Sequence, residues 1–402
     1  MQVVVVGSGA REHALAWCLS RSPQLTELHA APGNPGIAAL GRCHPVRAED
    51  ADGLLGLAVT LGADLVVVGP EAPLVAGVAD ELRRNGIVVF GPGADAARIE
   101  GSKSFAKEVM RAAGVPTAET LSVARPPCVV KADGLASGKG VFVCHTAEEL
   151  DDALRAVQRL GGAVVIEELL EGREVSVFAL CDGRRAIPLG AAQDFKRIGD
   201  GDTGPNTGGM GAYSPVPWFT DVDAVVAEVH QPVVEELARR GTPFVGCLFA
   251  GLMVTEAGPR VLEFNARFGD PETQVLLPRL DGDLLELLAA AAHGDLGGLT
   301  APLGGAAAVT VVVAGPDYPA RSDYAGAPID GLAAAADAGA LVFHGGTAVR
   351  DGTVVTNGGR ILSVTATAAT VADARSRAYA AVDMIGFDGA QFRHDIAAGV
   401  DG

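Results

Sequence analysis

The first hundred residues alternate short apolar runs with segments of helical period. Residues 2–6, 65–68 and 87–90 are almost entirely apolar, which is typical of strands buried on both faces of a sheet. Between the first two runs, residues 11–19 place apolar side chains at helical spacing. This alternation predicts a Rossmann-like parallel sheet wrapped by helices over residues 1–98.

The pattern then becomes mixed, with short strands around glycine-rich turns. A helix is predicted over residues 102–113, because glycine and proline follow it. Strands are predicted at residues 128–131, 141–144, 163–167 and 174–180, with a helix at 148–160. We therefore predict a small α+β unit at 117–181, inserted into a larger α+β domain formed by 99–116 and 182–314.

The last part of the chain, residues 315–402, has predicted strands at 341–343 and 361–365 and a helix near 370–384. These elements predict a small C-terminal α+β domain. A chain of 402 residues is also too long for one hydrophobic core. The expected fold class is therefore α/β and α+β multidomain.

Composition narrows the classes of protein. Hydrophobic residues make up 49% and charged residues 20% of the chain, so ordered domains with buried cores are expected. No apolar run of about 18 residues lacks glycine or charge, which disfavours a membrane-spanning helix. The apolar residues 3–6 follow no basic segment and stop at Gly7, which indicates a buried strand rather than a signal peptide.

The six cysteines are scattered and form no Cys-x-x-Cys pair. We therefore expect neither a disulfide framework nor a zinc site, but reduced thiols in a cytosol. The net charge of −18 disfavours nucleic acid and anionic membranes as partners. Phosphate binding stays open wherever basic residues gather locally.

Gly7-Ser8-Gly9 follows the first predicted strand and precedes the first helix. Glycines there let a ligand approach the backbone, and the helix N-terminus offers free N–H groups to an anion. A dinucleotide site would need a small residue where Glu12 stands, and an acidic residue that residues 29–32 do not provide. NAD is thus disfavoured, and the motif indicates a phosphate site or a structural turn.

The segment from Lys131 to Gly140 (KADGLASGKG) is similar to a Walker A loop but departs from it. Gly134 and Gly138 are one residue too close, Gly140 replaces Ser or Thr, and a strand follows instead of a helix. A hairpin of this length suits a lid over a triphosphate, with Ser137 and backbone N–H groups on the phosphates and Lys131 neutralising charge. The alternative is an exposed hairpin turn.

Glu263, Asn265 and Arg267 share one face of a predicted strand, since strand side chains repeat every two residues. A carboxylate and an amide oxygen side by side suit a hard cation such as Mg²⁺. The neighbouring Arg267 suits a substrate carboxylate or a transferring phosphate. The alternative is an exposed polar strand face, but polar residues continue to Gln274 more densely than such a strand end requires.

Two further stretches carry candidate binding residues. Residues 193–213 are rich in Asp, Asn, Thr and Gly and include Lys196 and Arg197. A structureless segment of this length inside a compact domain favours a substrate-binding loop over a mobile surface loop. Residues 165–174 join a strand to an acidic turn, which suits an adenine held by the backbone and a ribose held by a carboxylate. This last pattern is nonspecific on its own.

Together, these stretches resemble the glycinamide ribonucleotide synthetase family of the ATP-grasp superfamily, nearly from end to end. The most specific piece is RFGDPETQ at residues 267–274. The other matching segments lie at residues 7–14, 31–34, 68–74, 100–103, 131–140, 202–214, 263–266 and 356–360.

The resemblance implies an ATP-grasp fold with residues 117–181 as its lid. It also implies that ATP, glycine and 5-phosphoribosylamine give glycinamide ribonucleotide, ADP and phosphate through a glycyl phosphate, so that positioning and charge neutralisation dominate catalysis. Mg²⁺ or Mn²⁺, a cytoplasmic location and transient contact with the enzyme that makes phosphoribosylamine are expected. Nucleic acid and membranes are not.

The same resemblance implies a role for individual residues. The implied ATP-binding residues are Lys103, Lys131, Gly134, Ser137, Gly138, Lys139, Gly140, Glu167, Leu169 and Glu174, of which Glu167 and Leu169 meet adenine by their backbone and Glu174 meets the ribose. The implied metal ligands are Glu263 and Asn265. Arg267 and Asp194 are implied to orient glycine or its acyl phosphate. The implied substrate-binding residues are Gly9, Arg11, Pro70 and Glu71, facing phosphoribosylamine, and Lys196, Gly208 and Gly209.

Three features depart from the family. Phe195 stands where the family commonly has His, which argues against an essential role for that ring. The lid is shortened before Cys128 and again before Ala163, so lid movement or nucleotide affinity is expected to differ. Gly251 stands where many ATP-grasp enzymes place another metal carboxylate, so the metal is expected to rely more on water and phosphate.

Three alternatives remain open. Another ATP-grasp carboxylate–amine ligase would share the ATP site and differ in the N-terminal glycines and residues 193–213. A nucleotide-binding regulator without turnover is disfavoured, because Lys103, Lys131, Glu263 and Asn265 are all present. A hydride-transfer enzyme would need the NAD site that the first glycine motif disfavours.

Overall fold

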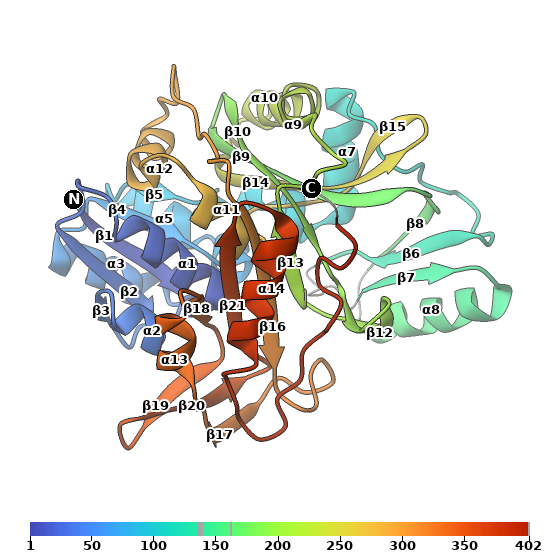
Figure 1. Ribbon diagram of the computed structural model, residues 1–402. Helices are drawn as coiled ribbons and strands as arrows, with labels where there is room; N and C mark the ends of the chain where they lie inside the picture. Colours follow the sequence, from blue (N-terminus) through green and yellow to red (C-terminus); the bar gives the residue numbers. More distant parts are fainter. Residues whose placement is uncertain (135–139, 161–162, 401–402) are drawn as a thin grey trace.

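The computed structural model describes residues 1–134, 140–160 and 163–400. Three residues of the expected lid loop, Ser137, Gly138 and Lys139, lie outside this part. The N-terminal domain (blue) and the small unit around residues 128–168 lie at opposite ends of the molecule, with a large sheet between them (Figure 1). Among the described residues, no helix is both long and apolar enough to cross a bilayer.

The N-terminal domain is built on a five-stranded sheet in the order β3-β2-β1-β4-β5, in which every pair is parallel. Its strands are β1 (Gln2–Gly7), β2 (Glu27–Pro32), β3 (Arg42–Cys43), β4 (Leu65–Val68) and β5 (Val89–Phe90). Its helices are α1 (Ala10–Leu19), α2 (Pro35–Ala38), α3 (Ala51–Leu61), α4 (Glu71–Val75) and α5 (Val78–Arg84). Residues 3–7 of β1 are all buried, which explains the unbroken apolar run and confirms the predicted parallel sheet.

Two helices, α6 (Ala94–Gly101) and α7 (Lys103–Ala113), lead to a small antiparallel sheet in the order β7-β6-β8. Its elements are β6 (Cys128–Ala132), β7 (Val141–Cys144), α8 (Ala147–Leu160) and β8 (Val164–Glu168). The unit has a core of its own, which includes Val130 and Val157 and is separate from the two larger cores. Its hydrophobic packing is therefore separate from that of the rest of the molecule.

One eight-stranded sheet dominates the rest of the molecule, in the order β15-β14-β9-β10-β13-β16-β21-β18. Its strands are β9 (Arg173–Asp182), β10 (Ala186–Asp194), β13 (Gly211–Ser214), β14 (Val245–Thr255), β15 (Gly258–Asn265), β16 (Ala307–Ala314), β18 (Leu341–His344) and β21 (Arg360–Ala368). All neighbouring strands are antiparallel. The sheet runs without interruption from the central region into the C-terminal one.

Shorter elements surround this sheet. The helices are α9 (Val222–Val225), η1 (Val226–His230), α10 (Gln231–Arg239), α11 (Thr273–Leu276), η2 (Leu277–Arg279), α12 (Leu284–His293), α13 (Leu332–Asp337) and α14 (Val371–Val382). A two-stranded sheet joins β11 (Arg197–Gly199) to β12 (Thr203–Asn206), and a three-stranded sheet joins β17 (Tyr324–Pro328), β20 (Thr353–Gly358) and β19 (Thr347–Arg350). The predicted multidomain α/β and α+β class is confirmed.

The prediction of a structureless segment at residues 193–213 is wrong, because β11 and β12 form a hairpin there. Residues from the far end of the chain support it. Arg393, which is 1% exposed, donates to the carbonyl oxygen of Arg197 at 3.1 Å and pairs with Asp202 at 2.7 Å. Arg393 lies 196 residues beyond Arg197 in the chain. The local pattern of hydrophobic and polar residues therefore gives no sign of this contact.

Candidate active site

Arg267, just beyond the end of β15, connects three side chains. Its guanidinium lies 3.2 Å from the Glu71 carboxylate, 3.1 Å from Glu100 and 3.2 Å from the amide oxygen of Asn265. Burial disfavours the charged form, but Glu100 and Glu71 outweigh it and raise the pKa of Arg267 above its usual value. Arg267 is therefore a fixed, permanently charged group.

The two carboxylates beside Arg267 differ in acidity. Burial raises the pKa of Glu71, but Arg267 and Arg11 outweigh it and lower that pKa to about 2. At Glu100 the effect of burial outweighs that of the Arg267 charge, so the pKa of Glu100 is raised. This holds although the Glu100 carboxylate also accepts the Ala266 N–H at 2.7 Å. Arg267 thus has one firmly ionised partner and one weakly acidic partner.

The first glycine motif makes room for the buried side chain of Glu12. A Cβ atom added at Gly7, Gly9 or Gly69 would lie 2.6, 2.7 or 2.1 Å from an atom of Glu12. The Glu12 carboxylate accepts the Gly9 N–H at 2.7 Å and pairs with Arg11 at 2.6 Å. An internal carboxylate therefore takes the backbone amide of Gly9, which a bound phosphate would otherwise use.

Lys103, the first residue of α7, lies at the base of the lid hairpin. Its ammonium group donates to the carbonyl oxygen of Gly134 at 3.1 Å, and its backbone N–H donates to the Asp133 carboxylate at 2.6 Å. Burial lowers the pKa of Lys103, while Glu263 opposes this effect and Lys131 adds to it. The charges of Glu263 and Lys131 therefore both act on the Lys103 ammonium group.

Glu167 on β8 bridges two buried lysines. Its carboxylate oxygens lie 2.7 Å from Lys107 and 2.6 Å from Lys131, and only 2% of its side chain is exposed. Lys131 also donates to the carbonyl oxygen of Leu262 at 3.0 Å. In the sheet, Val129 and residue 120 flank Glu167 on its two sides. The Glu167 side chain therefore positions Lys131, a role that the sequence did not suggest.

Glu263 and Asn265 lie two residues apart at the end of β15. Asn265 is 8% exposed, and its side-chain nitrogen has no acceptor within the described ranges. Gly251 on β14 is paired directly with Glu263, so a carboxylate at that position would lie beside Glu263. Among the described residues, no group of three or more His, Cys, Asp or Glu could hold a metal. A metal here would therefore need ligands from phosphate or water.

Lys196 follows β10 and pairs with two carboxylates. Its ammonium group lies 2.7 Å from Asp194 and 2.7 Å from Glu174. Burial acts to lower the pKa of Lys196, but the two carboxylates outweigh it and hold that pKa well above its usual value. The expected ribose residue Glu174 and the expected glycine residue Asp194 are thus joined through one lysine.

The ring of Phe195 packs beneath the C-terminal region. The Arg393 guanidinium lies 5.0 Å from the ring centroid, and the Tyr213 ring lies 6.3 Å from it. The backbone of Phe195 bonds to Met210 and Gly211. A phenyl ring under an arginine needs no titratable nitrogen, so this residue serves packing in the present chain.

A cavity of about 530 Å³ lies between the three parts of the molecule. Its polar lining includes Ser8 and Asn34 from the N-terminal domain, Asp270 from the segment after β15, and Asn357 and Arg360 from the C-terminal region. Glycine-rich backbone at residues 345–346 completes one wall. Of the residues expected to face phosphoribosylamine, Gly9 lines this cavity, whereas Arg11, Pro70 and Glu71 do not.

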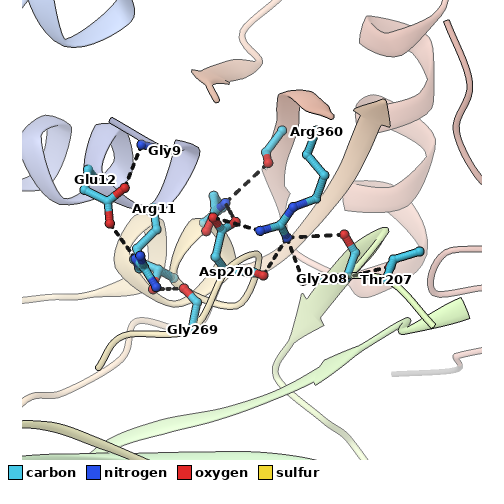
Figure 2. A network of polar contacts seen from close by, with 12 residues as sticks. Gly9, Arg11, Glu12, Thr207, Gly208, Gly269, Asp270 and Arg360 are labelled. Atoms are coloured by element: carbon cyan, nitrogen blue, oxygen red, sulfur yellow. Dashed lines mark hydrogen bonds and ion pairs between the residues drawn. The ribbon is translucent and has the colours of Figure 1, made fainter. Parts of the chain in front are cut away.

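Arg360 closes the cavity toward the central sheet. Its guanidinium pairs with the Asp270 carboxylate at 3.2 Å and donates to the carbonyl oxygens of Gly208 at 2.6 Å and Asp270 at 2.7 Å. Figure 2 shows Asp270 between the Arg11–Glu12 pair of α1 and Arg360. One network therefore connects α1, the segment after β15, and β21.

Several expected residues are brought together and others are not. Five of the expected residues lie in two polar clusters. One cluster contains Arg267, Glu71 and Asn265, and the other contains Asp194 and Lys196. Leu169 lies just past the end of β8, and Gly134 and Gly140 flank the part of the lid loop that the structure does not describe. The residues that sequence reasoning did not assign are Asn34, Glu100, Lys107 and Arg360. Asn34, Glu100 and Arg360 lie inside segments that match the family, so those matches were the available signal.

Comparison with known proteins agrees with this geometry. Residues 1–100 match the N domain of phosphoribosylglycinamide synthetase, residues 101–273 its ATP-grasp (A) domain, and residues 308–399 its C domain. The phosphoribosylamine–glycine ligase of Streptomyces coelicolor is 56% identical over 99% of each chain. That of Leifsonia xyli is 51% identical over 99% of this chain and 100% of the relative.

Solved structures show the same fold. The crystal structure of phosphoribosylamine–glycine ligase from Thermotoga maritima has a TM-score of 0.84 at 33% identity, covering 99% of this chain and 100% of that one. The biotin carboxylase domain of a Hydrogenobacter thermophilus 2-oxoglutarate carboxylase, solved with MgADP, has a TM-score of 0.70 at 18% identity, covering 97% and 91% of the two chains. The expected ATP-grasp architecture is confirmed.

Proposed function

The chain belongs to the phosphoribosylglycinamide synthetase family, and from this premise we propose that its ligation passes through a glycyl phosphate. Like its relatives, it is an ATP-dependent ligase of purine biosynthesis that joins glycine to 5-phosphoribosylamine. In the proposed sequence, a glycine carboxylate oxygen attacks the γ-phosphorus of ATP and ADP leaves. The amine then attacks the acyl carbon, the C–O bond to phosphate breaks, and the amine loses a proton.

The position of the segment 267–274 carries this proposal. Its first residue, Arg267, contacts Asn265 on the side of the expected metal, and Asp270 lines the cavity on the other side. Glycine takes part in both half-reactions, so it must meet ATP and the amine in turn. A substrate held by this segment lies within reach of both, which is how an enzyme of this type lowers the entropic cost of two successive transfers.

We place the ATP phosphates at Lys103 and Lys131, on the side where Glu263 shares their electrostatic environment. Adenine then lies beyond the end of β8 near Leu169, where the backbone leaves the sheet. Glu174 would share its carboxylate between Lys196 and the ribose. The assignment of Ser137, Gly138 and Lys139 to the phosphates rests on the sequence.

ATP-grasp enzymes bind ATP with a divalent metal, and we propose Mg²⁺ or Mn²⁺ with Glu263 and Asn265 as its protein ligands. Two oxygen donors fit a hard cation that keeps phosphate and water as its other ligands. Glycine at position 251 supplies no second carboxylate beside Glu263, in keeping with such a site. When bound, the metal neutralises phosphate charge, while Lys103 and Arg267 hold the reacting groups in place.

We place 5-phosphoribosylamine in the cavity of about 530 Å³. This volume is ordinary for a small-molecule site, and the Arg360 guanidinium and the Asn34 amide suit a sugar phosphate. The proposal includes a cytoplasmic location, with which six free cysteines agree. It also includes transient contact with the enzyme that makes phosphoribosylamine.

The test is ADP release with ATP, Mg²⁺, glycine and freshly generated phosphoribosylamine, omitting each component in turn. Product is identified by mass. Hydroxylamine, added in place of phosphoribosylamine, should trap the glycyl phosphate as glycine hydroxamate. Ligation without any trapped hydroxamate, or with oxygen-18 from the glycine carboxylate missing from the released phosphate, would contradict the acyl phosphate.

A further inference from the structure

Arg393 contacts the residues on either side of Lys196. Its guanidinium group lies 5.0 Å from the ring centroid of Phe195 and donates to the carbonyl oxygen of Arg197 at 3.1 Å. Only 1% of the Arg393 side chain is exposed, so these contacts are made inside the protein. One buried cation from the end of the chain therefore holds both neighbours of a residue in the candidate active site.

The side chains of this stretch point alternately to two sides. Lys196 pairs with Asp194, two residues before it, and with Glu174, each at 2.7 Å. The ring of Phe195, which stands between Asp194 and Lys196 in the chain, lies against Arg393 instead. Side chains alternate in this way along extended backbone. Arg393 therefore supports the stretch from behind, and Lys196 faces the two carboxylates on the other side.

Lys196 needs such support because its own side chain is not enclosed. The Lys196 side chain is 41% exposed, and a lysine loses much rotamer freedom when it is held in one place. Since packing does not enclose the ammonium group, its ion pairs depend on where the backbone lies. That backbone is tied to Thr207, whose N–H and hydroxyl group donate to the Lys196 carbonyl oxygen at 2.7 and 2.9 Å.

Arg393 also holds the turn of the β11–β12 hairpin, which begins directly after this stretch. Asp202 in the turn pairs with Arg393 at 2.7 Å. Its neighbour Gly201 donates its backbone N–H to the Asp395 carboxylate at 2.8 Å. The hairpin is thus fixed at its turn, as well as at its start through the Arg197 carbonyl group.

The shape of the guanidinium group suits this set of partners. The Nε and Nη2 atoms of Arg393 donate to the two carboxylate oxygens of Asp395 at 2.7 and 2.6 Å. This leaves Nη1 for the Arg197 carbonyl oxygen and for Asp202. A lysine has a single nitrogen atom and cannot reach partners on both sides of a planar fork. Arg393→Lys therefore keeps the charge and removes the geometry.

We propose that Arg393 is a positioning residue of this ligase, which acts through its neighbours in space to place Lys196 between two carboxylates of the active site. The inference rests on the proposed function, in which Glu174 meets the ribose of ATP, and on the expected role of Asp194 in orienting glycine. It gives the C-terminal region a part in the glycine and ATP site, in addition to its part in the wall of the cavity.

The first measurement is the kinetics of Arg393→Lys with ATP, Mg²⁺, glycine and phosphoribosylamine. The values of kcat/KM for glycine and for ATP should fall roughly tenfold or more, because small displacements in an active site are costly in rate. Arg375→Lys is the matched control. Arg375 donates to carbonyl oxygens of the same C-terminal segment, those of His394 and Ile396. Among the described residues it forms no hydrogen bond or ion pair with residues 195–202, so its kcat/KM should stay within about twofold.

The second measurement reports the position of Lys196 without turnover. The protein is treated briefly with acetic anhydride, and acetylated lysines are identified by mass spectrometry of peptides. An ammonium group held by two carboxylates reacts slowly, because only the free amine attacks the reagent. Lys196 should therefore be acetylated roughly three to ten times faster in Arg393→Lys than in the wild type. Lys107, which is buried beside Glu167, should react at an unchanged rate.

If Arg393→Lys does not fold, Asp202→Asn provides both measurements. The Asp202 side chain is 69% exposed, and asparagine tolerates the φ of 53° at this position. The variant removes one ion pair of Arg393 and leaves its other contacts. It should show the same two changes at smaller size.

Two results would overturn the inference. One is a folded variant with the kinetics of the wild type. The other is a loss of rate in which Lys196 keeps its wild-type rate of acetylation, or in which Lys107 is acetylated faster by the same factor. Either pattern would assign Arg393 to the stability of the fold as a whole. Failure of the proposed function is seen separately, as a wild-type enzyme that makes no glycinamide ribonucleotide.

Discussion

The Asp133 carboxylate accepts a hydrogen bond of 2.6 Å from the backbone N–H of Lys103. It also accepts the hydroxyl group of Ser104 at 2.6 Å. Asp133 is the residue that follows β6 in the lid, and Lys103 begins α7 in the core. The lid is therefore anchored at a helix N-terminus, where free N–H groups and the helix dipole both favour a carboxylate.

Replacing Asp133 by Ala should loosen this anchor. Loss of a carboxylate that accepts backbone N–H groups at a helix N-terminus costs about 0.5–2 kcal/mol of stability, and amide hydrogen exchange should quicken at Lys103 and Ser104, whose N–H groups donate to Asp133. Because Lys103 would be less well placed, the KM for ATP should rise roughly threefold to tenfold. The control is Asp50→Ala, which removes the cap that Gly53 N–H donates to at the start of α3. An equal change in ATP affinity in both variants would show that the effect is only one of stability.

Replacing Arg267 by Lys should lower kcat by about 100-fold, because a lysine keeps the charge but cannot contact Glu71, Glu100 and Asn265 together. Steady-state kinetics measure this loss. Arg260→Lys is the matched control, since Arg260 lies on β15, the strand that leads to Arg267, is 36% exposed and lies 3.7 Å from Glu168. A kcat near the wild-type value in Arg267→Lys would mean that charge alone is enough at this position.

Glu71 should contribute stability that depends on pH. Its pKa is lowered from 4.5 to about 2 in the folded protein, so the stabilisation is complete above the unfolded value and is lost as pH falls from about 5 toward 2. At about 1.4 kcal/mol per unit, the upper bound is about 3 kcal/mol. Urea unfolding of the wild type and Glu71→Gln across this range measures the difference. A difference that stays constant with pH would contradict the assignment.

Replacing Glu167 by Gln should destabilise the junction between lid and core. Lys107 and Lys131 would lose their shared carboxylate while remaining buried, and breaking a buried pair costs about 3–5 kcal/mol. Thermal and urea unfolding report the loss. The adjacent Glu168 has a 37% exposed side chain, so Glu168→Gln should change stability by about 1 kcal/mol or less. Equal losses in the two variants would argue against the buried bridge.

Two glycine-to-alanine changes should act in opposite directions. In Gly69→Ala the new methyl group would lie 2.1 Å from the Glu12 Oε1 atom, so Glu12 must leave Arg11, at a cost of about 1–3 kcal/mol. In Gly56→Ala nothing lies within 4 Å, and the exposed interior of α3 should gain up to about 1 kcal/mol. Urea unfolding measures the change in the free energy of unfolding for both variants. A stabilised Gly69→Ala protein would mean that Glu12 moves freely.

The sequence predicted elements best where burial dictates local pattern. The bounds of β4 and β7 match the predicted runs. For β4, which lies between β1 and β5 and is buried throughout, the reason is that a strand inside a parallel sheet must be apolar along its length. β7 is an edge strand with Val143 exposed, so burial does not explain its apolar run. The hairpin of β11 and β12 was missed because it is short and polar and depends on Arg393. No local period reveals a partner that the chain reaches only at its far end.

The candidate site was predicted where one segment supplies several groups. Glu263, Asn265 and Arg267 are near in sequence and remain near in space. Arg360 and Arg393 could not be assigned in the same way, because their significance depends on which groups they contact in the folded chain and on the cavity between domains. The sequence shows which residue types lie near one another along the chain. Whether a charged group has a partner can be seen only in the folded structure.

The uninterrupted eight-stranded sheet has a consequence for how the polypeptide is made. During synthesis, β13 leaves the ribosome well before β16, which covers its second side. Until the C-terminal strands emerge, the growing chain presents an open sheet edge of the kind that recruits other unfolded chains. A messenger truncated after β13 would thus yield an aggregation-prone fragment instead of a smaller working enzyme. The C-terminal strands protect the chain from aggregation by covering this edge, in addition to completing the fold.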